Sequence, residues 1–156
     1  MASTISSASM TVTLTESLVL NGVNQGSTKK MTITGVTAIS KRIMSTLHTG
    51  TGTQVYQGHL DTASIGQFIY GEVKYIRITN LDADNSVAIH IEDTSNTAYA
   101  QFLIPAGHVF FLTDAAGSYG NNSTAAIPTG NIEKINVMAQ TAAVDVEVMV
   151  ATGPSS

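Results

Sequence analysis

The sequence predicts an all-β domain of the sandwich or barrel class. Apolar and polar residues alternate with a period of two along most of the chain, and turn signals recur about every eight to twelve residues, which indicates about 8–11 short strands. Only 12% of the residues are charged, and Thr, Ser, Ala, Gly and Val dominate. Such a composition favours pleated, half-buried surfaces over helices.

The first strands are expected between residues 10 and 34. Glu16 interrupts their apolar side, which makes it a candidate β-bulge. Asn21-Gly22 tolerates positive φ angles and predicts a tight turn. The alternating apolar residues of these strands are Met10, Val12, Leu14, Leu18, Leu20, Met31 and Ile33.

The stretch 40–47 fits two structures. Its apolar spacing around Ile43 is compatible with a helix face and with a strand. We favour a strand because no helix cap or run of helix-forming residues accompanies it. A Gly/Thr-rich loop is expected over 48–67, with one short strand at 54–57.

Alternation is clearest in the second half of the chain. We expect Ile76 and Ile78 to face the core, and Tyr75, Arg77 and Thr79 to face water or a partner. Later strands carry the alternating sets Val87, Ile89 and Ile91; Ala98, Ala100, Phe102 and Ile104; Val109 and Phe111; Ile135, Val137 and Ala139; and Val144, Val146, Val148 and Val150.

Two connections in this half are also expected. Pro105-Ala106-Gly107 predicts a turn with Pro at its second position and Gly at its fourth. A second long loop, rich in Gly, Asn, Ser and Ala, is expected over 113–130.

The chain is expected to hold one domain, residues 10–151, between an N-terminal arm (1–9) and a C-terminal tail (152–156). The arm is small and polar, so it needs its own domain or a neighbour to order it. It lacks the charged and apolar regions of a secretory signal, and no stretch of 18 apolar residues occurs, so we expect synthesis in the cytoplasm and no membrane partner.

Composition also bears on partners. The chain has 7 Lys and Arg, 11 Asp and Glu, a net charge of −4 and no Cys. A dispersed set of so few cations argues against nucleic acid as a partner, and the lack of Cys excludes disulfides and thiolate metal sites. A surface so poor in charge suits burial against other copies or a partner.

Four histidines are the candidates for a metal or acid–base site. His48 and His59 flank the Gly/Thr-rich loop, and Asp61 follows His59 by two residues, so a zinc site would need a third converging ligand. His90 and His108 fall at alternating surface positions of strands. The four have no close ligand spacing, so we expect no metal or cofactor, and surface or inter-subunit hydrogen bonds instead.

A calcium-loop pattern begins at residues 82–86. It fails at its sixth position, Val87, where Gly is needed, and at its twelfth, Asp93, where Glu is needed. We therefore expect a turn with Asx hydrogen bonds.

No catalytic motif is complete. Asp145 and Glu147 share one strand face, as paired carboxylates of a glycoside hydrolase would, but the chain has no Trp and few other aromatic residues to stack on sugars. Residues 50–52 lack the Lys-Ser/Thr of a phosphate loop, and 117–120 lack the spacing of a nucleophile elbow. We expect a non-enzymatic protein.

Three segments in order carry a resemblance: VKYIRITNLDADNSVAIHIED, YAQFLIPAGHVFFL and INVMAQTAAVDVEVMVA. They resemble a group of small virion structural proteins of tailed bacteriophages, cyanophages in particular. The resemblance covers residues 71–151, about half the chain, and matches the N-terminal half only loosely, through SKRIMSTL. Pro105 and His108 depart from the middle segment without disturbing its strand-turn-strand pattern.

The resemblance implies a jelly-roll β-sandwich that builds or decorates a phage particle and has no catalytic residues. We expect a virion protein that forms a homo-oligomer, with three copies as the first expectation by analogy with threefold sites of shells. Its partners would be itself and the major capsid protein or other virion proteins, as capsid decoration or cement. A tail or fibre-adaptor component and an exterior glycan-binding module are the alternatives. Beside the loops 48–67 and 113–130, the candidate interface residues are Met1, Ser3, Ile5, His48, His59, Tyr75, Arg77 and Asn121.

Overall fold

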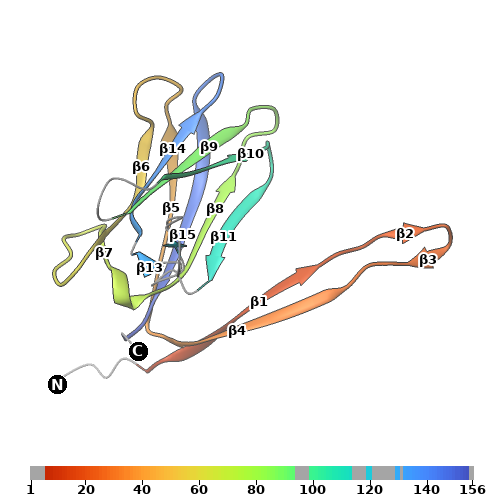
Figure 1. Cartoon of the computed structure of the whole chain (residues 1–156), viewed down its shortest axis with the longest axis horizontal. Helices are drawn as coiled ribbons and strands as arrows, with labels where there is room; N and C mark the ends of the chain where they lie inside the picture. The colour runs from red at the N-terminus through yellow and green to blue at the C-terminus, as the bar shows by residue number, and fades with distance from the viewer. Residues whose placement is uncertain (1–5, 94–98, 114–118, 121–128, 131, 155–156) are drawn as a thin grey trace.

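The computed structural model describes residues 6–93, 99–113, 119–120, 129–130 and 132–154. Figure 1 shows a β-sandwich from which a long hairpin projects. The elements are β1 (Ala8–Thr15), β2 (Val19–Leu20), β3 (Val23–Asn24), β4 (Thr28–Val36), β5 (Ala38–Thr46), β6 (Thr53–His59), β7 (Phe68–Ile69), the 3-10 turn η1 (Tyr70–Glu72), β8 (Val73–Asn80), β9 (Val87–Asp93), β10 (Tyr99–Ile104), β11 (Val109–Thr113), β12 (Tyr119–Gly120), β13 (Thr129–Gly130), β14 (Ile132–Ala139) and β15 (Val144–Thr152).

The sandwich is a jelly roll. One sheet has the order β10-β9-β14-β6-β7 and the other the order β11-β8-β15-β5. The chain crosses repeatedly between these sheets, and eight of the strands form the two four-stranded layers that define this fold. The ninth, β7, is an edge strand that runs parallel to β6. The predicted all-β, jelly-roll-like sandwich is confirmed.

The core lies between the two sheets, where the alternating residues predicted from the sequence meet. Ile76 and Ile78 of β8 are fully buried, as expected. Phe110 and Leu112 of β11, rather than Val109 and Phe111, pack against this core. The other buried members include Val87, Ile89, Ile91, Ile104, Ile135, Val137, Ala139, Val144, Val146, Val148 and Val150.

The hairpin, residues 8–36, forms two small two-stranded sheets that are separate from the sandwich. β1 and β4 pair as antiparallel strands, and β2 and β3 pair at the tip. The tip is the predicted turn: Asn21 and Gly22 have φ angles of 51° and 78°, which suit a two-residue hairpin. Sequence alternation identified these strands correctly but placed them in the sandwich domain, whereas they extend away from it (Figure 1).

A second, smaller apolar cluster joins the hairpin to the sandwich. Val36 of β4 packs with Tyr75 and Ala151 on the outer face of the β11-β8-β15-β5 sheet. Gly153 permits this contact, because a Cβ there would lie 1.8 Å from the carbonyl oxygen of Gly35. We call this cluster the joint; the partly buried residues packed against it are Met10, Val12, Ile33 and Met149.

Three local expectations need correction. Tyr75 is 4% exposed, because the base of the hairpin covers the sheet face that was expected to meet water or a partner. Glu16 lies beyond the end of β1, and the bulge in this ladder falls between Ala8 and Met10. The turn after β10 is shifted by one residue: the amide of His108 donates to the carbonyl of Pro105 at 3.1 Å.

Other local expectations are confirmed. The ambiguous stretch 40–47 falls in β5, apart from its last residue, and forms a strand. The expected strand at 54–57 lies within the longer β6. The expected loop over 113–130 is not confirmed as a loop: it holds the short β12 and β13, and the rest of the stretch after Thr113 lies outside the described residues.

Asn80, at the end of β8, is a buried polar side chain that fastens two turns. Its side-chain amide donates to the carbonyls of Asn85 at 2.8 Å, Pro105 at 3.1 Å and Ile104 at 3.3 Å. Its side-chain oxygen accepts from the amide of Asp82 at 3.0 Å. Only an amide side chain presents donors and an acceptor together in this space.

Replacing Asn80 by Asp should destabilise the fold strongly. The substitution removes the donors and leaves a carboxylate facing carbonyl oxygens, so the free energy of unfolding should fall by about 1–3 kcal/mol or more in urea denaturation. Asn24→Asp is the matched control, because Asn24 is exposed and uses its side-chain oxygen as an acceptor for the Gly26 amide, which Asp retains. Equal losses in the two variants would contradict the role of Asn80.

Candidate functional site

The free part of the hairpin exposes an unusual amount of apolar surface. Leu14, Leu18, Val19, Leu20 and Val23 are 47–67% exposed. An isolated two-stranded hairpin is marginally stable in water, so a ribbon of this length gains most if its apolar side is covered. The hairpin is therefore the first candidate for an interaction element.

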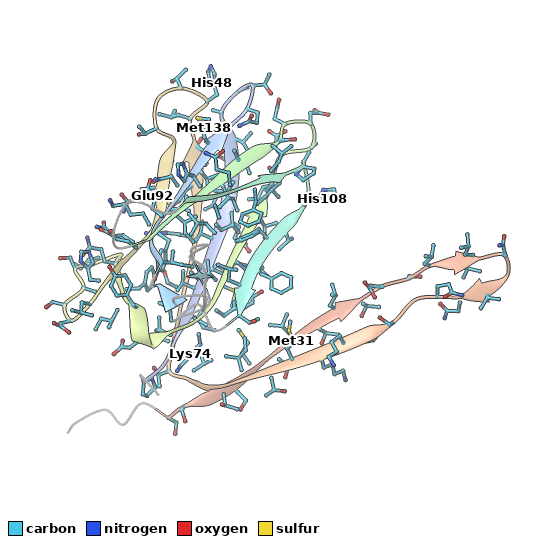
Figure 2. All side chains as sticks on the ribbon, in the orientation of Figure 1. Met31, His48, Lys74, Glu92, His108 and Met138 are labelled. Carbon is cyan, nitrogen blue, oxygen red and sulfur yellow. The ribbon has the colours of Figure 1, made fainter. Side chains whose placement is uncertain are left out.

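The face of the hairpin that forms the joint continues along the ribbon. Register pairs Met10 with Ile33, Val12 with Met31 and Leu14 with Lys29. Since paired residues point to one side of a ladder, these six lie on a single face. Figure 2 shows Met31 where the hairpin leaves the sandwich. The apolar face is thus covered at its base and uncovered beyond it.

The outer face of the β11-β8-β15-β5 sheet is also only half covered. Beyond the joint it exposes Ile43, Val109 and Phe111. The ring of Phe111 lies 6.3 Å from that of Tyr75 between centroids, so this surface is continuous with the joint. Two uncovered apolar surfaces, one on the hairpin and one on the sheet, therefore extend from the same cluster.

A charged strip crosses the uncovered part of this sheet. Glu147 of β15 accepts hydrogen bonds from Lys41 at 2.9 Å and from Arg77. The hydrogen bond from Lys41, helped by the charges of both cations, holds the pKa of Glu147 below its usual range. Asp145, the other carboxylate on this face, is exposed. Glu147 is thus occupied by ion pairs, and the two carboxylates border no described pocket.

A pocket of about 300 Å³, lined by both amide and apolar side chains, opens on the outer face of the other sheet. His90 of β9 lies between Gln101 of β10 and Asn136 of β14 in the register. Gly52 lets the preceding loop lie against β14, since a Cβ there would be 2.8 Å from the carbonyl oxygen of Val137. The lining residues are Gly50, Thr51, Ala88, Ile89, His90, Gln101, Asn136, Met138 and Gln140.

The candidate metal ligands do not come together. His48 precedes β6 and His59 ends it, so the length of this strand, about 20 Å at 3.3 Å per residue, separates them. His108 donates from Nδ1 to the carbonyl of Ala106 at 2.8 Å. Among the described residues, no group of three or more His, Asp or Glu side chains could hold a metal ion.

The calcium-like segment is a turn with Asx hydrogen bonds, as expected. The carboxylate of Asp82 accepts from the amides of Asn85 at 2.7 Å and Asp84 at 2.8 Å. The backbone hydrogen bond from Asp84, with that from Asn85, lowers the pKa of Asp82. This side-chain oxygen of Asp82 is therefore occupied by hydrogen bonds from backbone amides of the same turn.

The candidate interface residues are scattered. Arg77 lies beside the joint and Tyr75 within it, whereas His48 and His59 lie on the sandwich at opposite ends of β6. Met1, Ser3, Ile5 and Asn121 lie outside the described residues. The sequence did not predict the pocket or the projecting hairpin. It did assign the leucines of residues 14–20 to strands, but it gave no sign that they would be exposed.

Glu147 should make stability depend on acid pH. A carboxyl whose pKa is lowered by folding stabilises the native state above its unfolded pKa, near 4.5, and this contribution is lost as pH falls through the folded pKa. Glu147→Gln should therefore flatten the decline in unfolding free energy below pH 4.5, measured by urea denaturation from pH 3 to 7. Asp145→Asn, which removes a carboxylate of the same strand that takes no part in these ion pairs, is the matched control; identical profiles for Glu147→Gln and the parent would refute the assignment.

Comparison with known proteins identifies no relative. No family model matches the sequence, and neither the curated proteins nor the solved structures give a match. In the portion of the chain that the structure describes, no helix has the length and apolar character needed to cross a membrane.

Proposed function

We propose that this chain is a non-enzymatic structural subunit of a tailed-bacteriophage particle, most specifically a protein that decorates and cements the capsid shell. The observation that carries the proposal is the projecting hairpin of residues 8–36, whose leucines and valines are exposed in the isolated chain. A ribbon of this kind is suited to gripping a neighbouring subunit. The sparse charge of the chain agrees with a surface that is buried in an assembly.

Two further considerations support this role. Jelly rolls serve as building domains of viral capsids, although they also occur in lectins, so the fold alone does not decide. The sequence segments over 71–151 resemble small virion structural proteins of tailed phages. A tail or fibre-adaptor subunit would use the same hairpin, and differs in where the protein lies and in its copy number.

The mechanism would be clamping. Each copy binds neighbouring shell subunits only in the assembled state, so its binding free energy stabilises the shell and not the free subunits. The arm of residues 1–9 would contribute by adding a strand to the edge of a neighbour's sheet. Its last two residues already belong to β1. Many weak bridges would then act together on one particle.

Copy number tests the proposal. Quantitative mass spectrometry of purified particles, with the major shell protein as the internal standard, should give hundreds of copies per particle for a shell-decorating protein. A few to a few dozen copies would place the protein on the tail or a unique vertex and end the clamping mechanism. Its absence from particles would overturn the virion role altogether.

The amide-bearing pocket favours a second candidate function, glycan binding on the particle exterior. Its wall offers amides of Gln101, Asn136 and Gln140 with little charge, which suits the hydroxyl groups of a neutral sugar. Glu92 beside it is held by Asn136 at 3.1 Å. The described lining has no aromatic platform, so affinity would rest on hydrogen bonds and be modest.

A glycan array probed with the full-length protein tests this second function. Saturable binding to one class of neutral glycan should fall at least about tenfold, roughly 1.4 kcal/mol, in Gln101→Ala. Gln54→Ala is the matched control: Gln54 pairs in register with Asn136 on the same sheet but does not line the pocket. No binding on the array, or equal loss in both variants, would remove the pocket from consideration.

A further inference from the structure

The free hairpin and the half-covered sheet are complementary surfaces. The hairpin carries Val12, Met31 and Leu14 on the face that forms the joint. The sheet exposes the apolar side chains of Ile43 on one edge strand and of Val109 and Phe111 on the other. Both surfaces begin at the joint, and they diverge because the hairpin turns away from the sandwich (Figure 1). Neither surface can therefore cover the other within one chain.

The joint shows that this face of the hairpin packs against an apolar sheet surface. Met10, Val12 and Ile33 already pack against the joint, which includes Tyr75 and Ala151 of the same sheet. Beyond the joint, the same face of the hairpin continues with apolar side chains. The outer face of the sheet also continues with exposed apolar side chains that could receive them. The intramolecular contact thus serves as a template for a contact between copies.

Charge agrees with this pairing. Lys29 pairs with Leu14 across the strands on the same face of the hairpin, and Asp145 is an exposed carboxylate on the outer face of the sheet. Glu147 is ion-paired with both Lys41 and Arg77, so a covering ribbon buries no unpaired carboxylate from this strip, which keeps one net positive charge.

The dimensions also agree. Eight hairpin residues, 13–20, span about 27 Å at 3.4 Å per residue. The four strands of the sheet span about 14 Å between the outermost strands at their usual spacing. The free part of one hairpin is long enough to cross the whole sheet.

We propose that the hairpin of one copy lies across the uncovered half of the outer face of the β11-β8-β15-β5 sheet of a second copy, with Leu14 and Met31 against Ile43, Val109 and Phe111. This inference rests on the proposed structural role and names the partner of the hairpin as the chain itself. Hairpin and sheet are different surfaces, so the contact is heterologous, and repeated contacts close into a ring when the rotation between copies permits.

Engineered disulfides test the contact, because the chain has no Cys of its own. Full-length Leu14→Cys and Ile43→Cys are prepared separately, checked for folding by circular dichroism, mixed and oxidised. A mixed disulfide identified by non-reducing electrophoresis and mass spectrometry can only join two copies. We expect its yield to exceed, at least about tenfold, that of Thr13→Cys mixed with Ile43→Cys, since Thr13 lies on the opposite hairpin face.

The other outcomes overturn the contact. Equal yields from the Leu14 and Thr13 variants would indicate random collision, and Leu14 homodimers alone would indicate that hairpins pair with each other. A parent protein that stays monomeric by light scattering at all concentrations would also refute self-association. These results leave particle copy number untouched, so failure here is distinct from failure of the virion role; disulfides to the shell protein on particles would make that protein the partner instead.

Discussion

The apolar outer face of the β11-β8-β15-β5 sheet is the constraint on which the rest of the structure depends. In a two-sheet sandwich the inner faces make the core and the outer faces usually meet water. Here Tyr75 and Ala151 make part of an outer face apolar, so that sheet needs a second cover. The base of the hairpin supplies it through Val36 and Ile33, and so determines where the hairpin leaves the sandwich. Fold, hairpin and candidate interface thus follow from one sheet with two apolar faces.

The two outer faces of the sandwich are suited to different partners. The face beside the joint combines apolar residues with an ion-paired strip in which Glu147 has both cationic partners in its own chain. An exposed ion pair contributes little to stability, but the pairing of Glu147 lowers the cost of covering this face. The opposite sheet presents the amides of Gln101 and Asn136 around a pocket. That side suits a small polar ligand rather than another protein surface, because amides there would need partners if buried.

Sequence alternation predicted the strands and their core faces well, because burial between two sheets imposes a period of two. Ile76 and Ile78 follow this rule on β8. The same rule failed for Tyr75, since alternation assigns a residue to one of two faces but does not say that the second face is covered by a distant segment. Asn80 was missed for a related reason: its bonds go to turns far along the chain, up to Pro105. The pocket was unpredictable because it depends on neighbours across three strands.

The β1-β4 part of the hairpin has one apolar face and one polar face, and this limits how it can be used. Opposite the Leu14 face, Thr11 pairs with Thr32, and Thr15 pairs with Thr28. Threonines suit a pleated strand while leaving hydroxyl groups for water, so this face is stable in solvent. A ribbon inserted between two subunits would need two apolar faces, whereas a ribbon laid over one surface needs only one. The amphipathic pattern therefore favours a hairpin that straps the outside of a neighbouring subunit, with its threonine face remaining on the surface of the assembly.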